Sequence, residues 1–244
     1  MIPLPMLLSG NSSTFFTGTS KTGIPGAGIL GVVLLANTVD QTRQSVGVLL
    51  PLLIAADLFA VYYYRKHADW KVILRLLPWT LAGLGLGYAT LKMSKNLDFS
   101  YMLGGLVLGI LALDLLRNRM GWNRIPHHPL YTAVLGIATG FATTIGNVAG
   151  PVASLYLLSL GLEKHRLMGS LAWFFMIINL LKVPLFISAG MITGSSLQLS
   201  AYFLPGILCG ALCGRFLFKR IPSKPFAVAV QVLAAGAAVR LMLS

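Results

Sequence analysis

The chain has 244 residues, of which 56% are hydrophobic and only 10% are charged, and its formal net charge is +13. Its mean hydropathy is +0.80. A soluble domain carries about a quarter charged residues, so this composition excludes an ordinary soluble protein. No nucleic-acid partner is expected either, because most basic residues lie in short loops between apolar segments, where membrane orientation explains them.

Long apolar segments follow one another along the chain, most of them near the about 20 residues that a helix needs to cross a bilayer. We predict ten, at 4–20, 24–38, 44–64, 71–91, 99–117, 130–145, 148–161, 167–190, 197–218 and 224–243. The segments 24–38 and 148–161 are short, and each follows a stretch rich in Gly, Thr and Ser, at 18–28 and 140–151. Such a break between two helices predicts a broken or re-entrant hairpin, covered by protein or lining a water-filled cavity.

The two halves of the chain resemble each other. A P-x4-G-x3-G pattern occurs once in each half, as Pro78, Gly83 and Gly87 and as Pro205, Gly210 and Gly214. Three further glycines recur at one constant spacing, Gly18, Gly28 and Gly47 matching Gly140, Gly150 and Gly169. Weak internal symmetry of this kind is typical of repeated transporter folds.

We therefore predict an all-α polytopic membrane protein made of two repeats of about five helical segments each. The first two segments of each repeat are short or form the broken hairpin. Residues 1–118 form the first repeat, 119–129 a cytoplasmic linker and 130–244 the second repeat. Each half contains an odd number of crossings, so the second repeat is inverted relative to the first.

Loop charge predicts the orientation. One face receives eleven basic residues: Arg65, Lys66, Lys71, Arg117, Arg119, Arg124, Lys164, Arg166, Lys219, Arg220 and Lys224. The other face receives four, Arg43, Lys92, Lys95 and Arg240. Because cytoplasmic loops carry the excess of Lys and Arg, we expect a multi-pass protein of the cell (inner) membrane with both termini extracytoplasmic.

The two polar breaks are the best candidates for a binding site. Ser20, Lys21 and Thr22 precede the first short helix, and Thr144 and Asn147 precede the second. The first N–H groups of a helix are unsatisfied and its N-terminus is positive, so two such helices near the midplane make an anion site to which Lys21 adds a full charge. The alternative is that the glycines let helices approach and the hydroxyls bond to backbone.

Charged and amide groups also occur inside the third segment of each half. Asp57 corresponds to Asn179 at the constant spacing, and Lys182 lies three residues further on. Charges inside membrane segments are costly, so each is expected to have a role or a partner. For Asp57 the choices are a proton carrier, a partner of Lys21 or a structural ion pair; for Lys182 they are a functional cation or a snorkelling lysine.

Enzymatic and metal sites find no support in the sequence. No G-x-S-x-G, H-E-x-x-H or paired-carboxylate pattern occurs, and Glu163 is the one acidic residue of the second half. The two cysteines, Cys209 and Cys213, stand four apart in one apolar segment without a nearby histidine. We expect no enzyme activity, no cofactor and no metal.

The first break, GTSKTGIPGAGIL, resembles the sulfite exporter TauE/SafE family, also called the toluenesulfonate uptake permease family. The stretch GNVAGPVASLYLLSLGLEKHRLMGSLAWFFMIINLLKVPLF resembles the second repeat of that family. The resemblance implies transport of small sulfur-containing anions such as sulfite, thiosulfate or organosulfonates. Carried over onto matching positions, it favours Lys21, Asn147, Asn179 and Lys182 as site residues.

The sequence thus predicts a secondary transporter, an exporter of such anions working by alternating access among membrane lipids. A passive anion channel and a non-transporting protein that binds a sulfur compound are the alternatives. Coupling to a proton, through Asp57, or to a sodium ion, and assembly into a homo-oligomer, are compatible with the sequence. The predicted substrate contacts are Ser20, Lys21, Thr22, Gly26, Thr144, Asn147, Gly150, Asn179 and Lys182.

Overall fold

The computed structural model describes residues 3–23, 27–39, 42–93, 99–120 and 129–220, with Val239 and Leu243 as isolated positions. These residues form nine α-helices and one 3-10 turn, and no β-strand occurs among them. In chain order the helices are α1 Leu4–Thr22, α2 Ala27–Ala36, α3 Thr42–Tyr64, the turn η1 Arg65–His67, α4 Trp70–Met93, α5 Phe99–Met120, α6 Pro129–Gly146, α7 Gly150–Ser159, α8 Lys164–Ser188 and α9 Gly194–Arg220.

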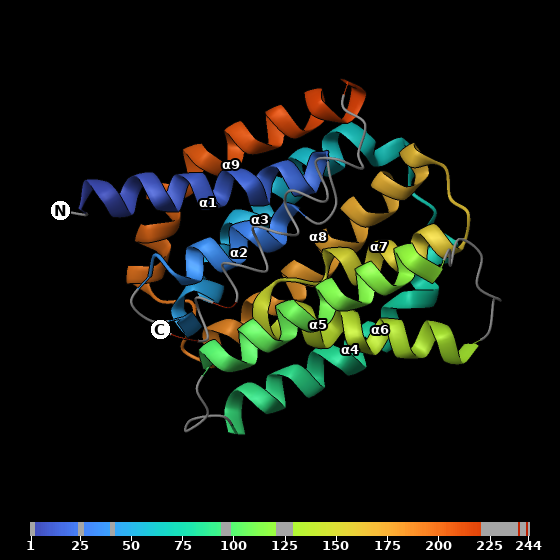
Figure 1. The fold of residues 1–244 in the computed structure, drawn as a ribbon, viewed down its shortest axis with the longest axis horizontal. Helices are drawn as coiled ribbons and strands as arrows, with labels where there is room; N and C mark the ends of the chain where they lie inside the picture. Colours follow the sequence, from blue (N-terminus) through green and yellow to red (C-terminus); the bar gives the residue numbers. More distant parts are fainter. Residues whose placement is uncertain are drawn as a thin grey trace.

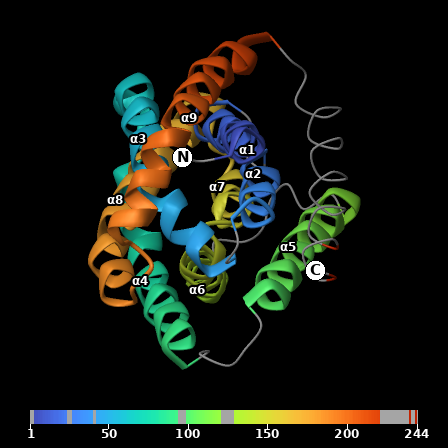
Figure 2. The same cartoon turned by 90° about the vertical axis from the view of Figure 1, so that its left-hand side faces the viewer.

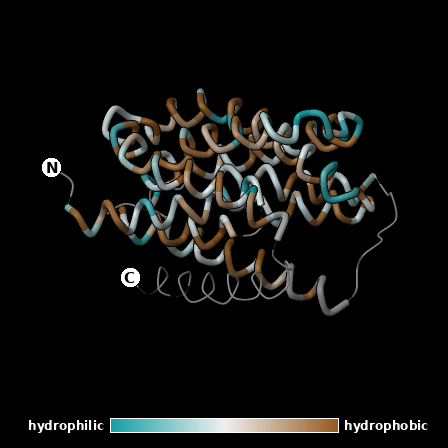
Figure 3. Tube along the Cα trace, turned by 90° about the horizontal axis from the view of Figure 1, so that it is seen from above, coloured by the Kyte–Doolittle hydropathy of each residue, from teal (hydrophilic) through white to brown (hydrophobic). Residues whose placement is uncertain are grey.

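Five of these helices are long and apolar enough to cross a membrane, and they span Arg43–His67, Trp70–Met93, Pro129–Gly146, Lys164–Ser188 and Gly194–Leu217. Large apolar side chains such as Leu58, Leu74 and Leu212 are exposed on the outside of the bundle. Lipid tails can cover such a surface, whereas water cannot do so cheaply. Brown, hydrophobic stretches accordingly predominate along the tube in Figure 3. The predicted all-α, multi-pass membrane protein is confirmed.

The helices begin and end close to the predicted segments. The predicted tenth segment, 224–243, and most of the predicted linker, 119–129, lie outside the described residues. The two short segments are confirmed, since α2 and α7 have 10 residues each. A 10-residue helix is about 15 Å long, half of the about 30 Å hydrocarbon core.

The polar stretches are more helical than the sequence predicts. Residues 18–22 form the last turn of α1 and residues 140–146 the end of α6, so Ser20, Lys21 and Thr144 lie on helices and not in open breaks. The break between α6 and α7 is only 147–149. Hydroxyls bonded back to their own helix make this continuation inexpensive: Thr144 Oγ1 donates to the carbonyl oxygen of Gly140 at 2.7 Å.

Two helix pairs carry the most extensive packing, α1 against α9 and α4 against α6, and α3 packs against α8 between them (Figures 1 and 2). Each outer pair joins the first helix of one half to the fourth helix of the other. A Cβ on Gly210 would overlap the backbone oxygen of Phe15, and one on Gly83 would overlap that of Ile137. The glycines of the repeated P-x4-G-x3-G pattern therefore bring backbones together at matching places in the two pairs.

Candidate functional site

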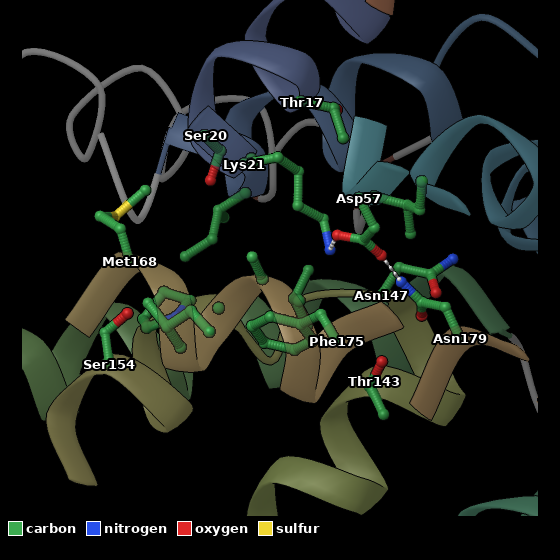
Figure 4. A pocket seen from close by; sticks show the side chains of 18 residues that line it. Thr17, Ser20, Lys21, Asp57, Thr143, Asn147, Ser154, Met168, Phe175 and Asn179 are labelled. Carbon is green, nitrogen blue, oxygen red and sulfur yellow. Dashed lines mark hydrogen bonds and ion pairs between the residues drawn. The ribbon is translucent and has the colours of Figure 1, made fainter. Parts of the chain in front are cut away.

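A cavity of about 50 Å³ lies between residues of both halves of the chain (Figure 4). It is surrounded by α1, α2 and α3 on one side and by α6, α7 and α8 on the other. Its polar lining is Thr17, Ser20, Lys21, Asp57, Thr143, Asn147, Ser154 and Asn179. Its apolar lining includes Leu53, Met168, Leu171 and Phe175.

A chain of charged and amide groups crosses this cavity from α1 to α8. Lys21 Nζ lies 2.7 Å from Asp57 Oδ1, and Asn179 Nδ2 donates to Asp57 Oδ2 at 2.6 Å. Figure 4 shows the three side chains pointing toward one another. Asp57 is fully buried, whereas Lys21 is 14% exposed. The Lys21 ammonium also lies over the Phe175 ring, 4.3 Å from its centroid, which adds a cation–π contact.

A second lysine is buried behind the opposite wall. Lys182 Nζ donates to the carbonyl oxygen of Thr143 and to its hydroxyl, each at 2.9 Å, and to Asn147 Oδ1 at 2.5 Å. Lys182 is completely buried, so the snorkelling alternative is wrong for this residue. Its three acceptors can take all three protons of an ammonium group, and none of them carries a charge.

The two lysines reach related positions from different helices. Asn179 lies 122 residues after Asp57, and the same spacing relates Thr143 to Lys21. In the first half the ammonium group therefore comes from the last turn of α1. In the second half it comes from α8 and is received by the matching threonine. Each half places a cation near the end of its first helix.

Asn147 holds the turn between α6 and α7. Its φ is 56°, in the left-handed region that asparagine tolerates better than most residues. While its Oδ1 accepts from Lys182, its Nδ2 donates to the carbonyl oxygen of Val46 on α3 at 3.0 Å. The amide thus joins both halves of the molecule at the start of α7.

The start of α7 faces the cavity without a side-chain cap. Its N-cap residue, Ala149, offers no capping group, and Gly150 and Ser154 both line the cavity. The Ser154 hydroxyl is buried and has no hydrogen-bond partner among the described residues. Free N–H groups at a helix N-terminus attract negative charge, so this end of the cavity suits an anion.

Most of the predicted site residues lie together. Ser20, Lys21, Asp57, Asn147, Gly150 and Asn179 line the cavity, and Lys182 is one layer behind it. Gly26 lies outside the described residues.

Thr22 and Thr144 are placed elsewhere, at helix–helix contacts. Thr22 Oγ1 donates to the carbonyl oxygen of Ala211 on α9 at 2.5 Å. Thr144 faces Gly87 on α4. Neither residue lines the cavity. The hydroxyl groups of both bond to backbone carbonyls, as the alternative interpretation of the polar breaks predicts.

Sequence reasoning did not single out Ser154, Met168 or Phe175 as lining residues. Phe175 lies four residues before Asn179 on α8, and Ser154 four residues after Gly150 on α7, so helical spacing from the predicted residues points to both. Met168 lies two helical turns before Phe175 on the same face of α8, so the spacing reaches it by way of Phe175.

The fold and the cavity define a multi-pass α-helical membrane protein with a charged site amid its helices. Within the described ranges no group of three or more His, Cys, Asp or Glu side chains is placed to hold a metal ion. The family model for the sulfite exporter TauE/SafE matches residues 12–241, and the chain belongs to that family of membrane transporters. No curated protein and no solved structure matched the chain.

Proposed function

We propose that this protein is a secondary transporter that exports small sulfur-containing anions such as sulfite by alternating access. The observation that carries the proposal is the cavity in which Lys21 and the uncapped start of α7 face the same space. Membership of the sulfite exporter TauE/SafE family supports a sulfur-containing anion as the substrate.

The charges around the cavity favour an anion. Among the described residues around it, the lysines at 21 and 182 outnumber the one carboxylate, Asp57. Charged side chains inside a membrane protein are expensive and need partners. A bound anion would supply the counter-charge that these two cations otherwise share with a single acid.

The size of the cavity favours a compact substrate. One water molecule occupies a probe sphere of about 10–15 Å³. A space of about 50 Å³ therefore has room for a few atoms, as in sulfite. An arylsulfonate would need the cavity to widen. We propose sulfite and short organosulfonates as the preferred class.

Two repeats of opposite orientation would supply the alternating access. We propose residues 1–118 and 130–244 as the repeats, with 119–129 between them and α1–α2 and α6–α7 as re-entrant hairpins. The helix packing supports this arrangement. The first helix of each half packs on the fourth helix of the other half, α1 on α9 and α6 on α4, as a two-fold relation between the halves requires. Rocking one half against the other would open the cavity first to one side and then to the other. We propose the membrane as the cell (inner) membrane with both termini outside the cytoplasm.

Substrate binding is tested with Lys21→Ala in purified protein, titrated with sulfite in a thermal-shift assay. A ligand that binds only the folded state raises its melting temperature. We expect the sulfite-induced shift to disappear in Lys21→Ala. It should remain in Lys71→Ala, a matched control at an exposed position of α4. An unchanged shift in Lys21→Ala would overturn the anion site.

Transport is tested separately in proteoliposomes. A secondary transporter accumulates sulfite against its gradient when a proton or sodium gradient is imposed. Flux that only dissipates the sulfite gradient under either driving ion would identify a passive channel. Binding without flux would identify a non-transporting binder.

A further inference from the structure

Three charged side chains surround the cavity, and their charges do not cancel. Within the described part of the chain, Asp57 and Lys182 are the only charged side chains classed as buried, and Lys21 is 14% exposed. The other buried polar side chains there are serines, threonines and one asparagine. With both lysines protonated, the site carries one positive charge in excess.

Among the side chains that the structure describes, Asp57 has no ionisable partner besides the two lysines. Lys21 approaches from α1, and Asn179 and Lys182 belong to α8. Arg215 on α9 lies over the Tyr63 ring instead, 3.7 Å from its centroid. α2 carries no charged residue, and neither do the side chains of α5 that the structure describes. Within the described ranges, Asp57 is therefore the one acid available to take up a proton at this site.

Net charge decides what the cavity can hold, because an uncompensated charge inside a membrane protein is energetically costly. A bound anion keeps both nearby lysines in their charged form. One monoanion then neutralises the site with Asp57 ionised. A dianion leaves one negative charge too many unless a proton binds to an oxygen of Asp57.

We propose that the cavity selects its anion by charge, taking a monoanion while Asp57 is ionised and a dianion only together with one proton on Asp57. The proposal rests on the anion-binding function proposed above. It makes Asp57 a site of proton uptake specific to dianions, and Lys182 the residue that fixes the preferred charge from behind the wall.

The test compares two probe ions whose own charges stay constant over the working pH range, methanesulfonate as the monoanion and sulfate as the dianion. Dissociation constants for both are measured on the same purified protein across that range. Uptake of one extra proton makes affinity fall about tenfold per pH unit as pH rises. We expect sulfate to lose affinity more steeply than methanesulfonate by about this factor.

Two variants should change the pattern in opposite ways. Asp57→Asn leaves two cations and no acid, so sulfate should bind more tightly than methanesulfonate and lose its extra pH dependence. Lys182→Met leaves one cation and one acid, so methanesulfonate should acquire the pH dependence that sulfate has in the parent protein. Asp69→Asn is the matched control. The Asp69 carboxylate lies 2.9 Å from the Arg166 guanidinium, and this ion pair is away from the cavity.

The outcomes separate the two proposals. If neither ion, nor sulfite, binds the parent protein, the anion-binding function itself is wrong. If the ions bind with equal pH slopes, charge selection is wrong and the function stands. A sulfate slope that survives Asp57→Asn would likewise overturn charge selection. Should either variant fail to fold, the other and the slopes of the parent protein still decide the question.

Discussion

Asn179 is the residue through which the two halves share one carboxylate. Its Nδ2 donates to Asp57 Oδ2 at 2.6 Å, and its Oδ1 is buried without a partner among the described residues. The amide group is therefore only half satisfied in this structure. An unsatisfied buried acceptor costs about 1–3 kcal/mol, which a water molecule in the cavity would recover by donating to it.

Replacing Asn179 by leucine should weaken both stability and binding. The change removes the donor to Asp57 and leaves one carboxylate oxygen unpaired. We expect a lower melting temperature than in the parent protein and a smaller sulfite-induced shift. The exposed Leu180→Ala, next to it on α8, is a control for general perturbation of that helix, because it adds no polar group to the apolar outer surface. A parent-like melting temperature in Asn179→Leu would contradict a structural role for the bond.

Thr143 contributes one hydroxyl and one carbonyl oxygen to the buried ammonium of Lys182. Thr143→Val keeps the shape and the carbonyl but removes the hydroxyl acceptor. A hydrogen bond to a charged group is worth about 1.5–3 kcal/mol, so unfolding should become easier by roughly that amount. Thr90→Val serves as the comparison, because that hydroxyl bonds within its own helix on the exposed side of α4. If Thr143→Val and Thr90→Val lower the denaturation midpoint equally, the Thr143 hydroxyl does not stabilise the Lys182 ammonium group.

At the scale of elements, closely approaching helices decide how the site is held. α4 presents Gly83 to the backbone of Ile137 on α6, whereas nothing lies within 4 Å of a Cβ built on Gly85. The same helix thus offers a packed glycine and an open one two residues apart. Because successive residues face different directions around a helix, only one of them can lie at the contact.

Gly83→Ala should separate α4 from α6, and Gly85→Ala should not. Forcing a methyl group into a filled contact costs about 1–3 kcal/mol. At an open helical site, alanine in place of glycine is neutral or stabilising. Melting temperatures of the purified variants measure the difference. If Gly83→Ala and Gly85→Ala have the same melting temperature, the close contact between α4 and α6 does not limit the stability of the protein.

At the scale of the whole molecule, the proposed inversion makes a prediction about sidedness. The loop after α3, at 65–69, and the loop after α8, at 189–193, occupy matching places in the two halves. Under inverted topology they lie on opposite sides of the membrane. Lys66→Cys and Thr193→Cys are each introduced into a protein in which Cys209 and Cys213 have been replaced. The two new cysteines should differ in how accessible they are to a thiol reagent outside intact cells.

A membrane-impermeant thiol reagent should label the cysteine at 193 in intact cells and reach the one at 66 only after the membrane is opened. Both positions have exposed neighbours, so access on the correct side is not limited by packing. Labelling of both cysteines from outside would contradict inversion. The reverse pattern would keep the inversion and overturn the orientation that loop charge predicts.

Much of the architecture was predictable because it depends on local properties. Apolar length identifies a membrane helix residue by residue, which is why nine segments agree with the helices within a few residues. Lys21, Asp57 and Asn179, which line the cavity, could be singled out because charged and amide groups inside apolar helices are rare. The sequence did not predict that Ser20 and Thr144 are helical, because Gly, Ser and Thr permit a break in a helix without requiring one.

By itself, then, the sequence determined a helical membrane protein with two short helices and a small set of buried polar groups. Only the tertiary structure decided that Lys21 pairs with Asp57, that Lys182 reaches Thr143 and Asn147, and that Thr22 and Thr144 face helix contacts. The physical reason is that the rotation of one helix against another is set by contacts between residues far apart in the chain. Hydrophobic length carries no information about that rotation.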